Sequence, residues 1–205
     1  DFEKLKATFV EFLNRLPFYG LAVLCVDDLV VRELLPTIGR PVITYGFADD
    51  ADVRALDVRP EGSGSHFIAV FKDGSREAFH LNLPGRHNVQ NTLAALAIAQ
   101  ELGVSVAAMQ KALSSFAGVG RRCEPHGTLV IDGARVTLID DYGHHPRELA
   151  ATFEAVRSAH PQQRLVVAFQ PHRYSRTRDL FDEFGEVLSS VDALLLFDVY
   201  AAGET

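Results

Sequence analysis

The sequence lacks the excess of positive charge that a protein needs to hold nucleic acid by general electrostatic attraction. Its formal net charge is -7, and its pI is near 5.6. Binding to nucleic acid is therefore not expected. A phosphate group on a smaller ligand would have to be held by a few local side chains.

Cysteine is scarce, and long apolar runs are missing. The two cysteines, Cys25 and Cys123, do not form a CxxC pair. Neither a disulfide framework nor a zinc site is therefore expected, and a reducing, cytoplasmic location fits best. No apolar run approaches the roughly 20 residues of a membrane-spanning helix, and no charged-then-apolar leader is present, so membrane insertion is not expected. These features leave the oligomeric state open.

The first residue is not methionine, and the chain stops at Thr205 just after a strand-like run. Both ends resemble cuts, so the chain is expected to be an interior part of a longer protein. Its 205 residues, 47% of them hydrophobic, are enough for one large domain or parts of two.

In the first part of the chain, hydrophobic spacing predicts alternating helices and strands. Phe2, Leu5, Phe9 and Phe12 recur at helical spacing, whereas residues 21–26 form a continuous apolar run, typical of a strand covered on both faces. The predicted elements are a helix over residues 2–13, a strand over 21–26, a helical segment through 35 and a strand over 41–46. This alternation indicates a parallel α/β architecture.

Residues 52–83 change to a two-residue periodicity, with a hairpin across Lys72-Asp73-Gly74, so an antiparallel layer is expected there. Two helices are predicted next, over residues 88–102 and 104–116. Gly118-Val119-Gly120 is the predicted boundary, because a second series of strands and helices begins after it. The chain is thus divided into domains over residues 1–117 and 118–205.

The second part has the elements of an incomplete Rossmann-like domain. A hairpin is predicted around Asp132-Gly133, and a helix begins with Pro146, a favoured first helical residue. The remaining predicted elements are a strand over residues 165–169, a helix over 177–190 and a strand over 193–197.

Three polar clusters follow predicted strands, the position where open parallel sheets bind ligands. The first is residues 85–91, in which His87 and Asn88 could also be an ordinary helix cap. The second joins residues 121–122 to 140–146, where aspartates, a tyrosine and two histidines gather at one strand end. The third, residues 170–179, places Arg173 and Arg176 three residues apart at a helix N-terminus, which favours an anion over a merely solvated face.

The stretches that carry these clusters resemble the Mur ligase family, in its alanine-adding branch. They are LPGRHNVQNTLAALAIA, GVGRRCEPHG, DDYGHHPREL, FQPHRYSRTRDLFDEF and DVYAAGE, in this order, with LPFYGLAVLCVDD near the start. The resemblance covers essentially the whole chain. It implies the rear part of the family's central ATPase domain followed by the front part of its Rossmann-like C-terminal domain. Cys123 departs from the family, which usually has an aromatic residue there.

The resemblance implies an ATP-dependent ligase that joins L-alanine to UDP-N-acetylmuramate through an acyl phosphate, in peptidoglycan precursor synthesis. The family's G-x-x-x-x-G-K-[ST] phosphate loop does not occur in this chain, and its Mg²⁺ ligands are expected upstream. The chain alone is therefore expected to be inactive.

The resemblance also assigns roles to individual residues. Adenine-side contacts are expected from His87, Asn88 and Asn91, with phosphate and ribose contacts from Arg122 and Asp141. Tyr142, His144, Arg173 and Arg176 are expected to hold the muramoyl-alanine end, the last three as catalytic residues. Whether His144 is a base or a positioning group stays open.

Other interpretations remain. Another member of the Mur ligase family would share the HN…N element. A dinucleotide-dependent oxidoreductase is suggested only by the Rossmann-like alternation, since no G-x-G-x-x-G opens a helix after a strand. A metal module built from His144, His145 and His172 would need more ligands at suitable spacing than the sequence offers, so no metal ligand is predicted.

Overall fold

The computed structural model describes residues 1–61 and 64–204, and the chain separates into two compact units. Unit 1 comprises residues 1–82 and 86–116, and unit 2 comprises residues 83–85 and 117–205. Each unit is described by itself. Residues 62–63 of the predicted antiparallel layer, and Thr205, lie outside the described residues.

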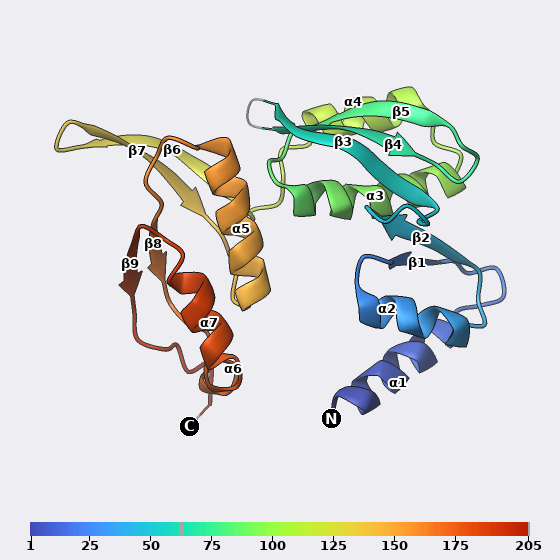
Figure 1. The fold of residues 1–205 in the computed structure, drawn as a ribbon, viewed down its shortest axis with the longest axis horizontal. Coiled ribbons are helices and arrows are strands. Elements are labelled where there is room, and N and C mark those ends of the chain that lie inside the picture. The colour runs from blue at the N-terminus through green and yellow to red at the C-terminus, as the bar shows by residue number, and fades with distance from the viewer. Residues whose placement is uncertain (62–63, 205) are drawn as a thin grey trace. The chain divides into compact units, whose positions relative to one another are not determined.

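Unit 1 is built on a five-stranded sheet in the order β1-β2-β3-β4-β5 (Figure 1). Its strands are β1 (Ala22–Cys25), β2 (Val42–Gly46), β3 (Val53–Glu61), β4 (Gly64–Val70) and β5 (Arg76–Leu81). The first three strands are parallel to one another, and β3, β4 and β5 are antiparallel. The predicted parallel strands with an attached antiparallel layer are therefore confirmed.

The helices of unit 1 are α1 (Phe2–Asn14), α2 (Leu29–Leu34), the 3₁₀ turn η1 (Leu35–Thr37), α3 (Arg86–Glu101) and α4 (Val106–Ser115). Helix α3 packs along β1 to β4, and α4 packs on β5. Leu93, Leu96 and Ala97 of α3 are buried together with Phe67 and Phe79 of the sheet. This core fixes the sheet-facing side of α3, so its N-terminal turns have a defined place beside the strands.

Unit 2 contains the hairpin β6 (Glu124–Ile131) and β7 (Ala134–Asp140), the parallel pair β8 (Val166–Phe169) and β9 (Ala193–Leu196), and helices α5 (Pro146–Ala159), α6 (Tyr174–Asp179) and α7 (Phe181–Leu188). Asp132 and Gly133 both have positive φ, as a two-residue hairpin turn of this kind requires. Unit 2 has a small hydrophobic core, formed by Leu149, Phe153, Phe169, Phe184 and Leu188.

Two predicted boundaries in the helices are wrong. The helix predicted over residues 177–190 begins at Tyr174 and is interrupted at Leu180, whose φ of -120° and ψ of 29° are not helical. Arg176 thus lies inside a six-residue helix rather than ahead of one. Helix α3 begins at Arg86, so His87 and Asn88 lie in its first turn.

No helix among the described residues is both long enough and apolar enough to span a membrane.

Candidate functional site

The candidate site residues of unit 1 lie where β1 and β2 end and α3 begins. Asp27, which follows β1, accepts hydrogen bonds from the N–H groups of Phe47 (2.8 Å) and Ala48 (3.0 Å), just after β2. Its Oδ2 also accepts from Gln90 Nε2 of α3, at 2.6 Å. One carboxylate therefore joins three segments that are distant in sequence.

Gly46 is required beside this carboxylate. A Cβ atom at position 46 would lie 2.5 Å from Asp27 Oδ1, closer than two nonbonded atoms can approach. Any larger residue at this position would force the Asp27 carboxylate to move away from the turn.

The first two turns of α3 carry the residues assigned to adenine. His87 and Asn88 are half-buried and Asn91 is exposed, whereas Val89 and Thr92 point into the core. Residues three and four positions apart are neighbours on a helix, so His87, Asn88 and Asn91 share one surface. The guanidinium of Arg86 lies 3.6 Å from the centre of the Phe47 ring, a cation–π contact at the same strand edge.

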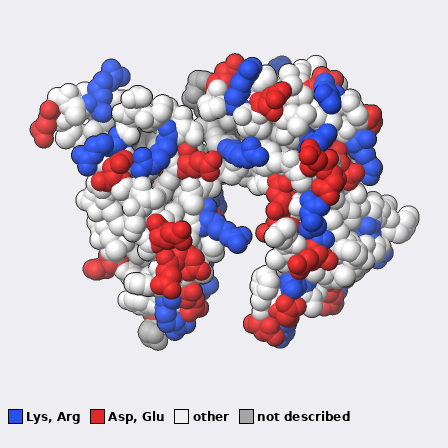
Figure 2. Space-filling view, viewed as in Figure 1, with Lys and Arg blue, Asp and Glu red and all other residues white. Residues whose placement is uncertain are grey.

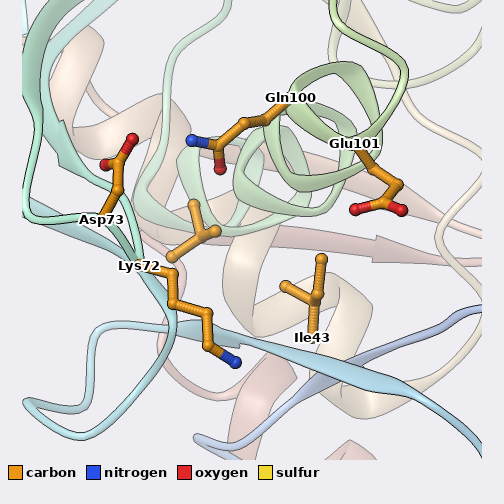
Figure 3. A pocket seen from close by; sticks show the side chains of 6 residues that line it. Ile43, Lys72, Asp73, Gln100 and Glu101 are labelled. Carbon is orange, nitrogen blue, oxygen red and sulfur yellow. The ribbon is translucent and has the colours of Figure 1, made fainter.

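A cavity of about 300 Å³ in unit 1 lies elsewhere (Figure 3). Its lining comes from β2, β3, the turn before β5 and the C-terminal end of α3: Ile43, Val53, Lys72, Asp73, Gln100 and Glu101. Lys72 is paired with Asp52 at 3.0 Å. The cavity is thus at the opposite end of α3 from His87 and Asn88. The residues predicted to bind the nucleotide do not line it.

In unit 2, Asp141 joins two loops. Its carboxylate accepts from the N–H of Cys123 at 2.8 Å and from the N–H of Gly143 at 2.7 Å. Arg121 and Cys123 have φ of +57° and +51°, values uncommon for residues other than glycine. Asp141 therefore stabilises the turn that contains Arg122. A ribose contact was predicted for Asp141, and this structural role was not.

Glu148, which was not among the predicted site residues, lies between Arg122 and His144. Its Oε2 accepts from the N–H groups of His144 (2.9 Å) and His145 (3.2 Å), and its Oε1 lies 3.4 Å from Arg122 Nη1. Burial raises the pKa of Glu148, but the hydrogen bonds from the His144 and His145 N–H groups and the nearby Arg122 guanidinium outweigh burial, so the pKa is lowered overall.

Aromatic rings form a row around His144. Tyr142 and His144 have ring centres 5.6 Å apart, His144 and His172 are 6.4 Å apart, and His172 and Tyr200 are 5.6 Å apart. The guanidinium of Arg121 lies 4.8 Å from the centre of the Tyr142 ring. The structure thus brings Tyr142 and His144 together with His172, which was not among the predicted site residues.

Arg173 is held in an unfavourable backbone conformation, with φ of +63° and ψ of 143°. Its N–H donates to the Tyr200 carbonyl at 2.8 Å, and its Nη1 lies 3.7 Å from Glu204 Oε1. Strain of this kind persists only where the surroundings impose it, and it is frequent at functional sites.

Glu204 also binds the start of α6, because it accepts from the N–H and the hydroxyl of Ser175, at 2.8 and 2.6 Å. These two hydrogen bonds lower the pKa of Glu204. Arg176 Nη1 is buried and has no hydrogen-bond partner among the described residues. A buried donor without an acceptor is costly, so this position favours an anionic ligand.

No group of three or more His, Cys, Asp or Glu side chains in residues 1–61 and 64–204 is arranged to hold a metal ion. His145 Nδ1 accepts from the Arg147 N–H at 3.2 Å, so one of its ring nitrogens is already used in the α5 cap. On the face drawn in Figure 2, basic and acidic side chains of the described residues are interspersed.

Three carboxylates of the candidate sites were missed by the sequence analysis: Asp27, Glu148 and Glu204. A signal existed for Glu148, because a glutamate three residues after a helix cap is the capping-box pattern, and the structure forms that box with His145. Asp27 and Glu204 bind backbone groups 20 and 29 residues away, and no local pattern reports such contacts.

Comparisons with known proteins agree along the whole chain. Residues 1–99 match the Mur ligase middle domain, and residues 121–205 match the Mur ligase, glutamate ligase domain. The UDP-N-acetylmuramate–L-alanine ligase of Halorhodospira halophila is 59% identical over 204 residues, which are 100% of this chain and 42% of that protein.

Solved structures share the fold. The UDP-N-acetylmuramate-alanine ligase of Thermotoga maritima matches with a TM-score of 0.76 at 23% identity, covering 98% of this chain and 42% of its own. The MurF ligase of Thermotoga maritima, solved in complex with ADP, matches with a TM-score of 0.76 at 20% identity, covering 95% and 44%. The chain thus spans less than half the length of each relative.

Proposed function

This chain belongs to the Mur ligase family, and we propose that it is part of an ATP-dependent ligase that joins L-alanine to UDP-N-acetylmuramate. The observation that carries the choice of substrates is the 59% identity, along the entire chain, to an L-alanine-adding ligase. Residues 1–117 would contribute the rear of the ATP-binding domain, and residues 118–205 the front of the C-terminal domain.

The nucleotide would be held at the N-terminal turns of α3. His87, Asn88 and Asn91 share one helix surface, and the amide of an asparagine offers both the donor and the acceptor that a base edge requires. Arg86, stacked on Phe47, adds a planar cation at the same edge. ATP would supply the phosphoryl group that activates the muramate carboxylate, with Mg²⁺ bound by ligands outside this chain.

The amino acid would be held in unit 2. Arg173 and the buried, unpaired Nη1 of Arg176 fit the carboxylate of alanine, because a guanidinium binds two oxygens at once. Tyr142 and His144 would face the muramoyl end, and Arg122 would contact phosphate. Asp141 would act mainly by holding the Arg122 turn through its two backbone hydrogen bonds.

The test is phosphate release by a full-length ligase that carries this chain. Release should depend on ATP, UDP-N-acetylmuramate and L-alanine together. Glycine, D-glutamate and UDP-muramoyl peptides should be poor replacements, and activity only with one of these would assign another reaction of the family. The 205-residue chain by itself should release no phosphate with the same three substrates.

A further inference from the structure

The surroundings of the His144 ring determine which nitrogen carries its proton. Nδ1 lies 3.1 Å from the Tyr142 carbonyl oxygen and 3.4 Å from Glu148 Oε2. Both neighbours can only accept hydrogen bonds, and a neutral imidazole has one donor nitrogen and one acceptor nitrogen. Nδ1 must therefore be the donor, which leaves Nε2 with its lone pair.

Glu148 is fixed where it imposes this choice. Its Oε2 is tied to the backbone of His144 and His145 by two N–H groups, within a helix cap that also contains Pro146. The lowered pKa of Glu148 keeps the carboxylate ionised at neutral pH. A fixed negative charge near Nδ1 favours the tautomer with the proton on that side.

The other groups around the ring come from several elements. Tyr142 lies on the same loop, Arg122 reaches Glu148 from the turn before β6, and His172 follows β8 with Tyr200 behind it. Arg121 lies over the ring of Tyr142. Among these groups, Glu148 is the one that brings a carboxylate to Nδ1.

We propose that Glu148 is a positioning residue that holds His144 with its proton on Nδ1, so that Nε2 accepts a hydrogen bond from the amine of the incoming amino acid. This rests on the proposed ligase function, because it assigns His144 to the amine. The sequence left open whether His144 is a base or a positioning group. The proposed tautomer makes its Nε2 a hydrogen-bond acceptor for the amine.

The tautomer can be read directly from the chain labelled with ¹⁵N-histidine. Long-range ¹H–¹⁵N correlations, with the His144 signals identified through His144→Gln, should show a protonated Nδ1 and an unprotonated Nε2. Glu148→Gln keeps the capping oxygen, since glutamine also serves in a capping box, but removes the charge. In this variant the fraction of the Nδ1–H form should fall.

Glu154→Gln is the matched control, because Glu154 is exposed on α5 six residues further along and its substitution changes the net charge equally. The control should leave the His144 signals unchanged. A wild-type ring protonated on Nε2, or a Glu148→Gln ring with the wild-type tautomer, would overturn the proposal.

The second measurement is the kinetics of the full-length ligase. Glu148→Gln should lower kcat about 10- to 100-fold, the scale on which activity falls when the hydrogen-bonding partner that orients a metal-bound histidine is lost, and should change the KM for ATP little. A tautomer shift with unchanged kcat would refute the link to the amine. If the wild-type ligase does not use alanine at all, the proposed function fails, whereas the tautomer result still stands.

Discussion

The two units hold their candidate sites by different means. In unit 1 the helix that carries His87 and Asn88 lies on a closed interior, in which Phe67, Leu93 and Ala97 have no exposed surface. In unit 2 the core residues remain 5–8% exposed. Its loops depend on carboxylates that accept backbone N–H groups, whereas in unit 1 the carboxylate of Asp27 joins segments that already lie on a closed interior.

This difference predicts how each site responds to substitution. Packing in unit 1 resists local change because a cavity in a dense core is costly. The loops of unit 2 depend on Asp141, Glu148 and Glu204, each of which binds at least two backbone or side-chain donors. Substitutions in unit 2 should therefore change activity more than stability, and core substitutions in unit 1 should do the reverse.

The largest effect is expected from Phe67→Ala in unit 1. Phe67 is fully buried and stacks on Phe79 with ring centres 5.7 Å apart. Its removal should cost about 3–5 kcal/mol of unfolding free energy, as for other buried phenylalanines. Urea denaturation followed by peptide-resolved hydrogen exchange would measure the loss in unit 1 alone.

Phe169→Ala is the matched substitution in the core of unit 2, where Phe169 is 6% exposed. It should cost less than Phe67→Ala, because a looser site can close around the missing ring. Equal costs for the two substitutions would mean that the units do not differ in packing.

Arg173→Lys in the full-length ligase should have the next largest effect. Lysine keeps the charge but cannot reproduce the planar two-pronged donor, so binding of the alanine carboxylate should weaken. Loss of one charge-assisted contact is worth about 1.5–3 kcal/mol, or about 10- to 150-fold in kcat/KM for L-alanine. The KM for ATP should barely move, and wild-type kinetics with alanine would refute the carboxylate role.

Asn88→Ala tests the site of unit 1 in the same ligase. Removal of a base-edge contact should raise the KM for ATP by a factor equivalent to about 1–3 kcal/mol while kcat stays near wild type. Gln110→Ala, elsewhere in unit 1, is a control for loss of an amide side chain. An unchanged KM for ATP in Asn88→Ala would leave Asn88 with only a structural role.

Much of the fold could be predicted because hydrophobic spacing reports it. The parallel strands β1 and β2 and the helix of residues 146–159 lie within about two residues of their predicted positions. The start of β6 was missed, since Pro125 and Gly127 interrupt the strand pattern and the pairing shifts register there. The break at Leu180 was missed because the apolar spacing continues across it, whereas only the backbone angles change.

The candidate sites were less predictable than the fold. The clusters around His87, His144 and Arg173 were visible because polar residues follow buried strands. The groups that orient them were not, since Asp27 and Glu204 act on backbone N–H groups far away in sequence. The positive φ of Arg173 could not be predicted either. Such a conformation favours glycine, and the residue at this position is arginine.

A comparison of Arg173→Gly with Arg173→Ala isolates this strain. Both substitutions remove the guanidinium, but only glycine adopts the conformation of Arg173 without steric cost. The strain amounts to about 1–3 kcal/mol, and the flexibility of unfolded glycine offsets about 0.5–1 kcal/mol of it. Arg173→Gly should therefore be more stable than Arg173→Ala by about 1 kcal/mol in thermal denaturation, and the reverse order would show that position 173 is not strained.

The smallest effect is expected from mild acid. The pKa values of Glu148 and Glu204 are below their ordinary 4.5 in the folded protein, so both carboxylates stabilise the fold above that pH. This contribution is lost as the pH falls below 4.5 and through the folded-state values. Both groups are partly exposed and screened by solvent, so the loss of stability should be modest.

Hydrogen exchange can locate this loss. After correction for the intrinsic effect of pH, protection of the N–H groups of His144, His145 and Ser175 should decrease between pH 5 and about pH 3, because these groups donate to the two carboxylates. In Glu148→Gln the change at His144 and His145 should disappear, while the change at Ser175 remains. A uniform decrease across both units would instead indicate general charge repulsion, and the contrast between packed and carboxylate-joined sites would not hold.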